Sequence, residues 1–328
     1  MSSPVKRKRY DVVIAGARCA GASTAMLLAR RGLRVLLVDP ARRGSDTLST
    51  HALMRGAVLQ LHRWGLLDAV RSSGVPAIRK TTFHYADEVI AIPIKERDGL
   101  DALYAPRRTV LDSVLVDTAL AAGAEVVHGQ SVVDLIWDEH GRVRGARISG
   151  ADRQVVDVEA TLVIGADGVR SRMARILGLE AYATASHATA SIYGYWRGLG
   201  LEGYHWYYDL GAAVGSIPTN AGETCVFASV PQRRFENLRS GGLEALYFEA
   251  LKDVSADLAE RVARSDGPGK LRAFAGEPGF LRRATGPGWA LVGDAGYFRD
   301  PLTAHGITDA LREAEFLSHA VLEGTDAA

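Results

Sequence analysis

Apolar positions in the first forty residues follow a strand, helix, strand order. The β-branched run YDVVIA over residues 10–15 predicts a strand that meets Gly16. Helical periodicity follows over residues 20–31 and ends at a glycine, which commonly closes a helix. LRVLLV over residues 33–38 is a continuous apolar run, typical of a buried parallel strand. The pattern therefore predicts one βαβ unit that ends at Asp39.

The later periodicity alternates between helical and strand-like segments. The expected elements are a helix over 52–64, a short helix over 66–71, a hairpin over 81–93, an amphipathic helix over 108–122, a strand over 125–128, a β-meander to residue 158, a short buried strand over 162–164, a strand over 289–292 and a closing helix over 306–322. Ser49 or Thr50 is expected to cap the helix that starts at Ala52.

These elements predict an α/β fold with two lobes. The first lobe combines a Rossmann-type parallel sheet with the β-meander, and the second contains an antiparallel sheet in which aromatic residues concentrate. The first lobe is expected to comprise residues 9–80, 101–178 and 285–328, and the second residues 81–100 and 179–284.

The turn after the first strand carries candidate chemistry. It reads Gly16-Ala17-Arg18-Cys19-Ala20-Gly21, and Asp39 follows about twenty residues later. In this arrangement a helix N-terminus receives a diphosphate and a carboxylate accepts from a ribose hydroxyl. Arg18 stands where the middle glycine is usual, so it adds bulk beside the phosphates and also a guanidinium that can face them. Cys19 is explained better by its small size than by redox chemistry.

Two further motifs follow predicted buried strands. The first runs from Gly165 to Ser171 and contains Asp167, and the second is Gly293-Asp294-Ala295-Gly296. Ligands of parallel sheets bind beyond the carboxyl ends of the strands, where both motifs fall. Gly306-Ile307-Thr308 then opens the closing helix, whose N-terminus suits the N1–C2=O edge of a flavin.

With these three motifs in this order, nearly the whole chain resembles the flavoprotein aromatic hydroxylase superfamily, typified by para-hydroxybenzoate hydroxylase and including geranylgeranyl-reductase-like and flavin-halogenase branches. The resemblance implies that FAD is bound by Gly16, Ala17, Arg18, Cys19, Ala20, Gly21, Asp39, Arg108, Val132, Asp167, Gly293, Asp294, Gly306, Ile307 and Thr308. Thr303-Ala304-His305 departs from the glycine-rich pattern usual before the last helix. Relatives also continue with further C-terminal helices, so a truncated or unusually short chain is expected.

Composition favours a small-molecule partner. With 39 basic and 38 acidic residues, the net charge of +1 indicates neither nucleic acid nor an anionic membrane as a partner. Two cysteines exclude a disulfide framework, and no apolar run is long enough to span a bilayer. The N-terminus does not read as a signal peptide, so a cytoplasmic location is expected. Metal and hydrolase motifs such as HExxH, paired CxxC and GxSxG do not occur in the sequence.

Several residues are candidates for catalysis or for the substrate pocket. His51 and His305 are candidates for proton transfer or flavin tuning, although local hydrogen bonding is an alternative for each. The alternating aromatics Tyr193, Tyr195, Trp206 and Tyr208 are candidates for lining an apolar pocket, with core packing as the alternative.

The resemblance implies a monooxygenase, although other reactions stay open. NAD(P)H would bind transiently and reduce FAD, and O₂ would form a C4a-hydroperoxyflavin that hydroxylates a small aromatic or polyketide-like substrate. The alternatives are a reductase or dehydrogenase of the geranylgeranyl-reductase-like branch and a non-catalytic flavin-binding protein. A halogenase is disfavoured because the WxWxIP signature is absent.

Overall fold

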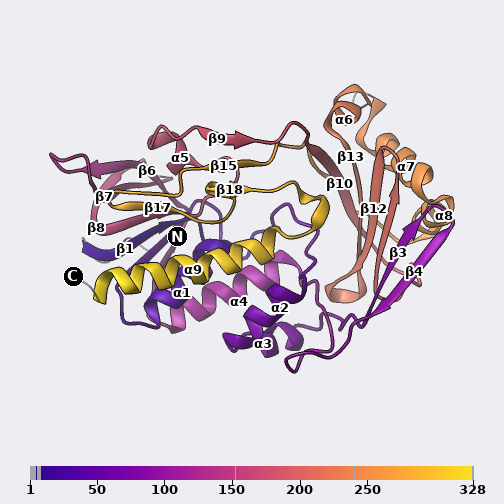
Figure 1. The fold of residues 1–328 in the computed structure, drawn as a ribbon, viewed down its shortest axis with the longest axis horizontal. Coiled ribbons are helices and arrows are strands. Elements are labelled where there is room, and N and C mark those ends of the chain that lie inside the picture. Colours follow the sequence, from indigo (N-terminus) through magenta and orange to yellow (C-terminus); the bar gives the residue numbers. More distant parts are fainter. Residues whose placement is uncertain (1–4, 6–8, 152, 239–240, 327–328) are drawn as a thin grey trace.

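A mainly parallel sheet forms the centre of the first lobe in this computed structural model, which describes residues 5, 9–151, 153–238 and 241–326 (Figure 1). Its strands are β1 (Arg9–Ala15), β2 (Val35–Asp39), β5 (Glu125–His128), β6 (Gln130–Trp137), β7 (Val143–Gly150), β8 (Val155–Gly165), β16 (Thr285–Gly286) and β17 (Trp289–Leu291). The order is β16-β17-β8-β1-β2-β5, and the four neighbouring pairs from β17 to β5 are parallel. β6, β7 and β8 form an antiparallel meander. The carboxyl ends of the parallel strands therefore lie at one edge.

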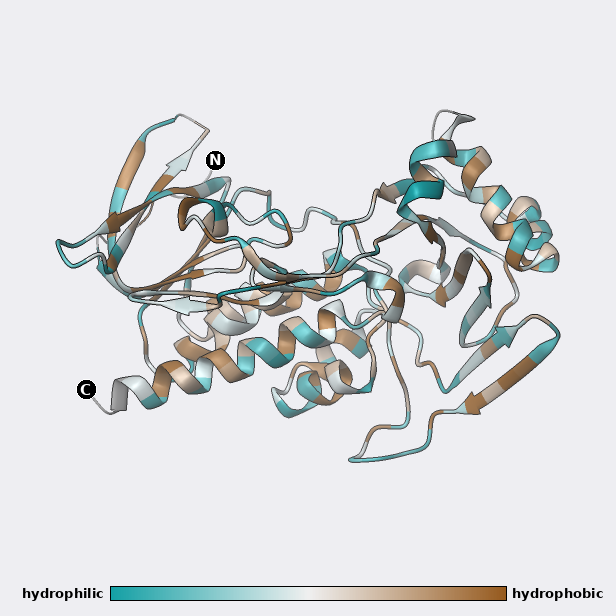
Figure 2. Cartoon of the chain, turned by 45° about the horizontal axis from the view of Figure 1, so that its top comes forward, coloured by the Kyte–Doolittle hydropathy of each residue, from teal (hydrophilic) through white to brown (hydrophobic). Residues whose placement is uncertain are grey.

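Alternate residues of the buried strands face two different layers. Val12 and Ile14 of β1 pack with the helices, whereas Val13 and Ala15 pack with the meander. Continuous apolar runs bury both faces in this way, as parallel strands require. The helices of this lobe are α1 (Cys19–Ala29), α2 (Arg55–Arg63), α3 (Leu67–Ser72), α4 (Arg108–Ala121), α5 (Arg172–Ile176) and α9 (Gly306–Asp326). Figure 2 shows apolar and polar residues alternating along α9, as expected of a helix with one buried side.

A seven-stranded sheet forms the centre of the second lobe. Its order is β14 (Arg272–Phe274), β10 (Thr189–Trp196), β13 (Thr224–Pro231), β12 (Ala212–Pro218), β11 (Tyr204–Asp209), β3 (Lys80–Tyr85) and β4 (Glu88–Pro93). Every pair is antiparallel except β11–β3, because β3 enters from the other lobe and not through a hairpin from β11. The helices α6 (Gln232–Leu238), α7 (Leu243–Val254) and α8 (Ala256–Arg264) lie against one face (Figure 1).

Short elements complete the fold. Beside the two large sheets lie the small sheet β9 (Ala181–Thr184), β15 (Phe280–Arg282) and β18 (Tyr297–Phe298) and the 3-10 turns η1 (Asn220–Gly222), η3 (Gly293–Ala295) and η4 (Pro301–Thr303). Among the described residues, no helix is long and apolar enough to cross a membrane.

The predicted α/β fold class is confirmed, with two local corrections. The expected helix from Ala52 begins instead at Arg55, and Met54 precedes it without a side-chain cap, so the capping role of Ser49 or Thr50 is wrong. The Ser49 hydroxyl accepts instead from the His51 N–H at 3.1 Å. The short strand expected at 162–164 is the end of the eleven-residue β8, whose exposed polar positions hide its continuity in the sequence.

Candidate active site at the carboxyl ends of the parallel strands

Two glycines shape the turn between β1 and α1. Gly16 has φ +107°, and a Cβ there would lie 2.4 Å from the Ala166 carbonyl oxygen. A Cβ on Gly21 would lie 1.8 Å from the Gly16 carbonyl oxygen. The first position therefore needs a left-handed backbone, and the second needs glycine so that α1 can pack closely on the strands. The turn leads into the positive N-terminal end of α1, which contains no acidic residue in its first turn and suits a phosphate.

The side chain of Arg18 reaches away from the turn, to Ser45 and Asp112. Its guanidinium donates to the Ser45 carbonyl oxygen at 2.7 Å and to the Asp112 carboxylate at 2.8 Å. Arg108 forms a second ion pair with Asp112 at 3.0 Å. Two guanidinium groups therefore share one buried carboxylate beside the helix N-terminus, which leaves an excess of positive charge where a diphosphate would lie.

Cys19 is buried in the same place and is a weak candidate for redox chemistry. Burial raises the pKa of its thiol to about 12, although the Arg108 guanidinium opposes the shift. The thiol is therefore protonated at neutral pH, and the thiolate is the reactive form of cysteine. The structure agrees with the interpretation of Cys19 as a small core residue.

Asp39 joins the ends of two neighbouring strands. Its carboxylate accepts from the backbone N–H groups of Ala17 and Ala41, each at 2.7 Å. Beside it lies a narrow recess whose lining includes Arg42, His128 and Val116 of α4. The site therefore combines an oriented carboxylate with basic side chains in a recess between the glycine turn, the β2 end and α4.

His128, which the sequence reasoning missed, is a second polar group in that recess. Its Nδ1 donates to the Ala41 carbonyl oxygen at 3.1 Å, which leaves Nε2 as an acceptor. That buried Nε2 has no hydrogen-bond partner among the described residues. The signal was present in the sequence, because His128 ends the strand beside β2 and is in register with Asp39.

Two residues assigned from the resemblance have mainly structural contacts. Asp167 accepts from the Ser171 hydroxyl at 2.5 Å and from the Arg172 N–H at 2.7 Å, so it holds the start of α5. Val132 is buried on β6 and packs in the core beneath the meander. Neither contact tests a role toward a dinucleotide.

The Gly293–Asp294 turn meets α1 and α9. A Cβ on Gly293 would lie 2.9 Å from the Ala20 Cβ, and the Gly293 N–H donates to the Glu313 carboxylate at 2.8 Å. Loss of water around the Asp294 carboxyl raises its pKa to about 6, with Arg108 opposing the shift. This motif therefore lies directly against the first motif, as does Ala166 of the second.

The first turn of α9 begins at Gly306 and places Ile307 and Thr308 beside this junction. The Thr308 methyl group lies 3.0 Å from the position of a Cβ on Gly56 in α2. Its hydroxyl oxygen and one carboxylate oxygen of Asp309 are buried without a hydrogen-bond partner among the described residues. The backbone carbonyl of His305 accepts from the Asp309 N–H at 2.8 Å, as any residue at a helix start would, so the role of its imidazole stays a prediction.

The four aromatic candidates lie on one face of the seven-stranded sheet, the face away from α7. Tyr193 and Trp206 are buried, and Tyr195 and Tyr208 are partly exposed against the same core. Tyr193 and Trp206 belong to one cross-strand row in which the Phe227 ring lies over Gly215. These side chains therefore form the face of the sheet that lies against the first lobe, called the aromatic wall below, and the buried ones are also part of the core.

His51 connects that wall to the segment that follows β2. Its backbone is left-handed, with φ +66°, and its side chain is almost completely buried. The Nε2 atom is hydrogen-bonded to the Tyr195 hydroxyl, and the two rings stack with centroids 5.6 Å apart. Burial and the nearby Arg108 and Arg107 guanidinium groups lower the pKa of His51 to about 3. The imidazole is therefore neutral across the physiological pH range.

An ion-pair network, also missed by the sequence reasoning, supports this contact. The Arg107 guanidinium lies 3.6 Å from the Tyr195 ring centroid, 3.0 Å from Asp46 and 2.8 Å from Glu223. Arg272 of β14 also pairs with Asp46, at 2.9 Å. These pairs join residues more than sixty positions apart and fasten the two lobes together beside the candidate site.

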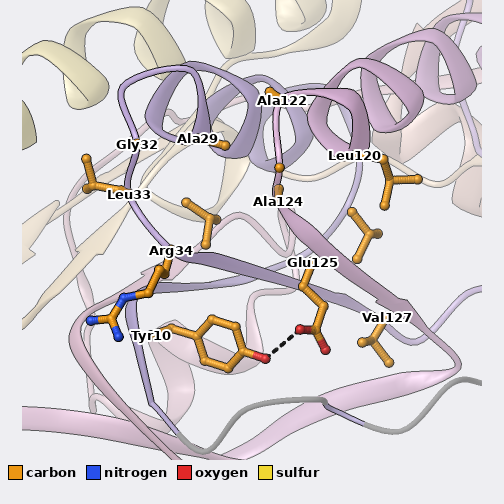
Figure 3. A pocket seen from close by; sticks show the side chains of 13 residues that line it. Tyr10, Ala29, Gly32, Leu33, Arg34, Leu120, Ala122, Ala124, Glu125 and Val127 are labelled. Carbon is orange, nitrogen blue, oxygen red and sulfur yellow. Dashed lines mark hydrogen bonds between the residues drawn. The ribbon is translucent and has the colours of Figure 1, made fainter.

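A cavity lies at the other end of the parallel sheet. It measures about 570 Å³ and is lined by residues that begin strands or follow helices, including Tyr10, Arg34 and Glu125 (Figure 3). The Tyr10 hydroxyl donates to the Glu125 carboxylate at 2.8 Å there. Because the three motifs lie at the carboxyl ends, this cavity is separate from the candidate site. The described residues contain no group of three or more potential metal ligands.

Comparison with known proteins identifies the family. The model of the FAD binding domain matches residues 9–196. The chain belongs to this FAD-binding family. It is 28% identical to menaquinone reductase of Mycolicibacterium smegmatis, over 96% of this chain and 77% of that protein. It is 25% identical to digeranylgeranylglycerophospholipid reductase of Methanosarcina mazei, over 98% of this chain and 77% of the relative.

Solved structures share the fold of this FAD-binding protein. The flavin-dependent brominase Bmp2 superposes with a TM-score of 0.83 at 18% identity and covers 98% of this chain and 80% of its own. PqsL, a probable FAD-dependent monooxygenase from Pseudomonas aeruginosa, gives 0.79 at 23% identity and covers 98% and 88%. At such identities the likeness concerns the fold alone. The family and its reductase relatives show that the protein is a FAD-dependent oxidoreductase.

The residues present fit FAD. The glycine turn allows close approach at the N-terminus of α1, and the shared carboxylate of Asp112 leaves positive charge beside it. Polar atoms without a described partner occur at both ends of the site, at His128 Nε2 and at Thr308 Oγ1. Such buried atoms generally need a hydrogen-bond partner, which a long polar cofactor across the strand ends provides.

Proposed function

We propose that this protein is an NAD(P)H- and FAD-dependent reductase that saturates a carbon–carbon double bond in an apolar substrate. The observation that carries the proposal is the aromatic face of the seven-stranded sheet, which lies against the FAD-binding lobe and ends at a neutral His51–Tyr195 pair. The two relatives described above, whose names denote reductases of menaquinone and of digeranylgeranylglycerophospholipid, support it.

The proposal assigns FAD to the line of motifs across the strand ends. Gly16 to Gly21 and Arg108 would hold the diphosphate, Asp39 the adenosine ribose with Val132 near the adenine, and Asp294 the ribityl chain. Gly306, Ile307 and Thr308 would meet the isoalloxazine, and Asp167 would support the dinucleotide through the start of α5. These roles follow from the family resemblance, and the proximity of the three motifs supports them.

Bound FAD supplies hydride transfer from a transient nicotinamide to the substrate. The chain itself then has to bind the substrate and supply a proton. Tyr193, Trp206 and Tyr208 would bind the apolar part of the substrate and exclude water. His305, a second candidate acid, directly precedes α9, beside the residues proposed to meet the isoalloxazine. His51 is the candidate that lies nearest the substrate wall.

A monooxygenase, the reaction predicted from the sequence, is the second candidate. The buried, largely apolar wall favours it equally, because exclusion of water protects oxygen chemistry at a reduced flavin. In that case O₂ and a small aromatic or polyketide-like molecule would be the substrates. The chemistry of the product distinguishes the two reactions.

The test uses FAD-loaded protein reduced anaerobically with NADH or NADPH. Menaquinone and a geranylgeranylated glycerophospholipid, each in detergent micelles, are added separately, and flavin oxidation and product mass are followed. The reductase predicts flavin oxidation without O₂ and a side chain that keeps two added hydrogens after exposure to air. Flavin oxidation that requires O₂, with a product heavier by one oxygen atom, would overturn it in favour of the monooxygenase.

A further inference from the structure

We propose that Tyr195 and His51 form a proton relay in which Tyr195 protonates one ring nitrogen of His51 while the other, Nδ1, donates its proton to the substrate. The relay rests on the proposed function and extends it, because it assigns the proton that must accompany each hydride. Tyr195 and Arg107 are thereby added as positioning residues that act through His51.

The contact between the two residues crosses the lobe boundary. His51 lies in the segment between β2 and α2, and Tyr195 lies 144 positions later on β10. The Ser49 N–H donates to the Tyr193 hydroxyl at 3.2 Å, so two neighbouring tyrosines hold the same segment. A non-glycine residue with φ +66° has an unfavourable backbone conformation, which persists where the surroundings require it. The His51 ring is therefore held at one place on the wall.

Hydrogen-bond accounting indicates the direction of the relay. If the Tyr195 hydroxyl donates to Nε2, only the Nδ1–H of His51 is left without a described partner. If Nε2–H donates to the phenol oxygen, both the phenol proton and the Nδ1 lone pair are left without one. Because His51 Nδ1 is buried and has no partner among the described residues, the first arrangement leaves fewer unsatisfied groups. The resting pair is therefore Tyr195 as donor and His51 as the Nδ1–H tautomer.

The surrounding charges favour a relay over a free imidazolium. The groups that face the pair are the cations Arg107 just before α4, Arg108 of α4 and Arg272 of β14, together with Asp46, Tyr193 of β10 and Cys225 of β13. The cations and burial oppose a second proton on His51. The Arg107 guanidinium over the Tyr195 ring instead favours a negative phenolate. Burial raises the pKa of Tyr195 above its usual value, so the phenol is protonated at rest and serves as the proton source.

The proton balance is complete within the proposed reaction. The Nδ1–H bond breaks as a new C–H bond forms at one carbon of the double bond, and bound FAD would supply the hydride for the other carbon. The Tyr195 O–H bond breaks as Nε2–H forms, so His51 begins and ends neutral. The phenolate remains beside Arg107 until product leaves; the Nε2 proton then returns to the Tyr195 oxygen as solvent supplies a new proton to Nδ1, which restores the resting pair.

The first test reads the resting state without any substrate. Protein labelled with ¹⁵N at histidine, with FAD bound, is titrated by NMR between about pH 5 and pH 8, where an ordinary histidine changes charge. We expect His51 to remain neutral, with hydrogen on Nδ1 and an acceptor at Nε2. Tyr195→Phe should abolish the preference between the two ring nitrogens. Tyr247→Phe is the matched control, because its phenol packs on the other face of the same sheet against Trp196 and should leave His51 unchanged.

A His51 signal that titrates near its ordinary pKa, or one with hydrogen on Nε2, would overturn the relay.

The second test follows flavin oxidation by the two lipid probes in single turnovers. Tyr195→Phe should slow this step about 100-fold and abolish its solvent isotope effect, with flavin reduction by NAD(P)H unchanged. His51→Asn should slow the same step to a similar extent, and asparagine is chosen because it tolerates the left-handed backbone. If neither probe oxidises the flavin, the proposed function fails, and the NMR experiment alone then decides the relay.

Discussion

Replacing Gly21 by alanine tests the packing on which the phosphate turn depends. The new Cβ would lie 1.8 Å from the Gly16 carbonyl oxygen and 3.0 Å from the Ala166 Cβ. Since real Cβ contacts below 3.0 Å are essentially never seen, α1 must move by about 1 Å. Ten of its eleven residues are buried, so the movement disturbs the core and costs about 1 to 3 kcal/mol of unfolding free energy.

The consequence for FAD is larger than the loss of stability. A shift of about 1 Å at a binding turn can cost ~100-fold, so we expect the FAD dissociation constant of Gly21→Ala to rise at least about 10-fold. Urea unfolding measures the stability, and quenching of flavin fluorescence measures the affinity. Gly32→Ala is the control: its φ is +84° with no atom within 4 Å of a new Cβ, so it should lose about 1 kcal/mol without weakening FAD binding. Normal FAD affinity in Gly21→Ala would refute the reasoning.

Three further changes test other parts of the site. The pKa of Asp294 is raised from 3.8 to about 6 in the folded protein, so its ionised carboxylate destabilises the fold above that pH. FAD-free protein should therefore gain stability from this group as the pH falls from about 6 to about 4. Denaturant melts at several pH values should show that Asp294→Asn lacks this gain. Asp39→Asn places an amide donor against the N–H of Ala17 or Ala41. Urea unfolding should show a loss of about 1 to 3 kcal/mol of unfolding free energy, and titration with FAD should show weaker binding. An unchanged unfolding free energy and an unchanged FAD affinity would contradict a role of these bonds in either. Cys19 should resist a thiol reagent at pH 8 until the protein is unfolded, and rapid labelling of the native protein would contradict its raised pKa.

Local sequence patterns were sufficient for the fold of the first lobe. The βαβ unit was predictable because β1 and β2 are continuous apolar runs joined by a helix between two glycines. The predicted helix from residue 108 is α4. The hairpin joins the far edge of the seven-stranded sheet through a parallel pairing with β11, and no local pattern contains such a long-range pairing.

The candidate site was predictable where backbone shape dictates the residue. Gly16, Gly21 and Gly293 stand at positions where a side chain would collide with a neighbouring strand or helix. By contrast, the partners of His51 were not predictable, because Tyr195 and Arg107 reach it from distant segments and neither belongs to a local motif. Side chains that join two lobes are fixed by tertiary packing, and a single sequence contains little local signal for them.

The most direct test of the account is a crystal structure of the protein with FAD. The account predicts one FAD extended along the strand ends, with its diphosphate at the N-terminus of α1, its adenosine ribose at Asp39 and its ribityl chain at Asp294. Protein that remains colourless after incubation with FAD and gel filtration, or density that places the flavin away from Asp294, would contradict it.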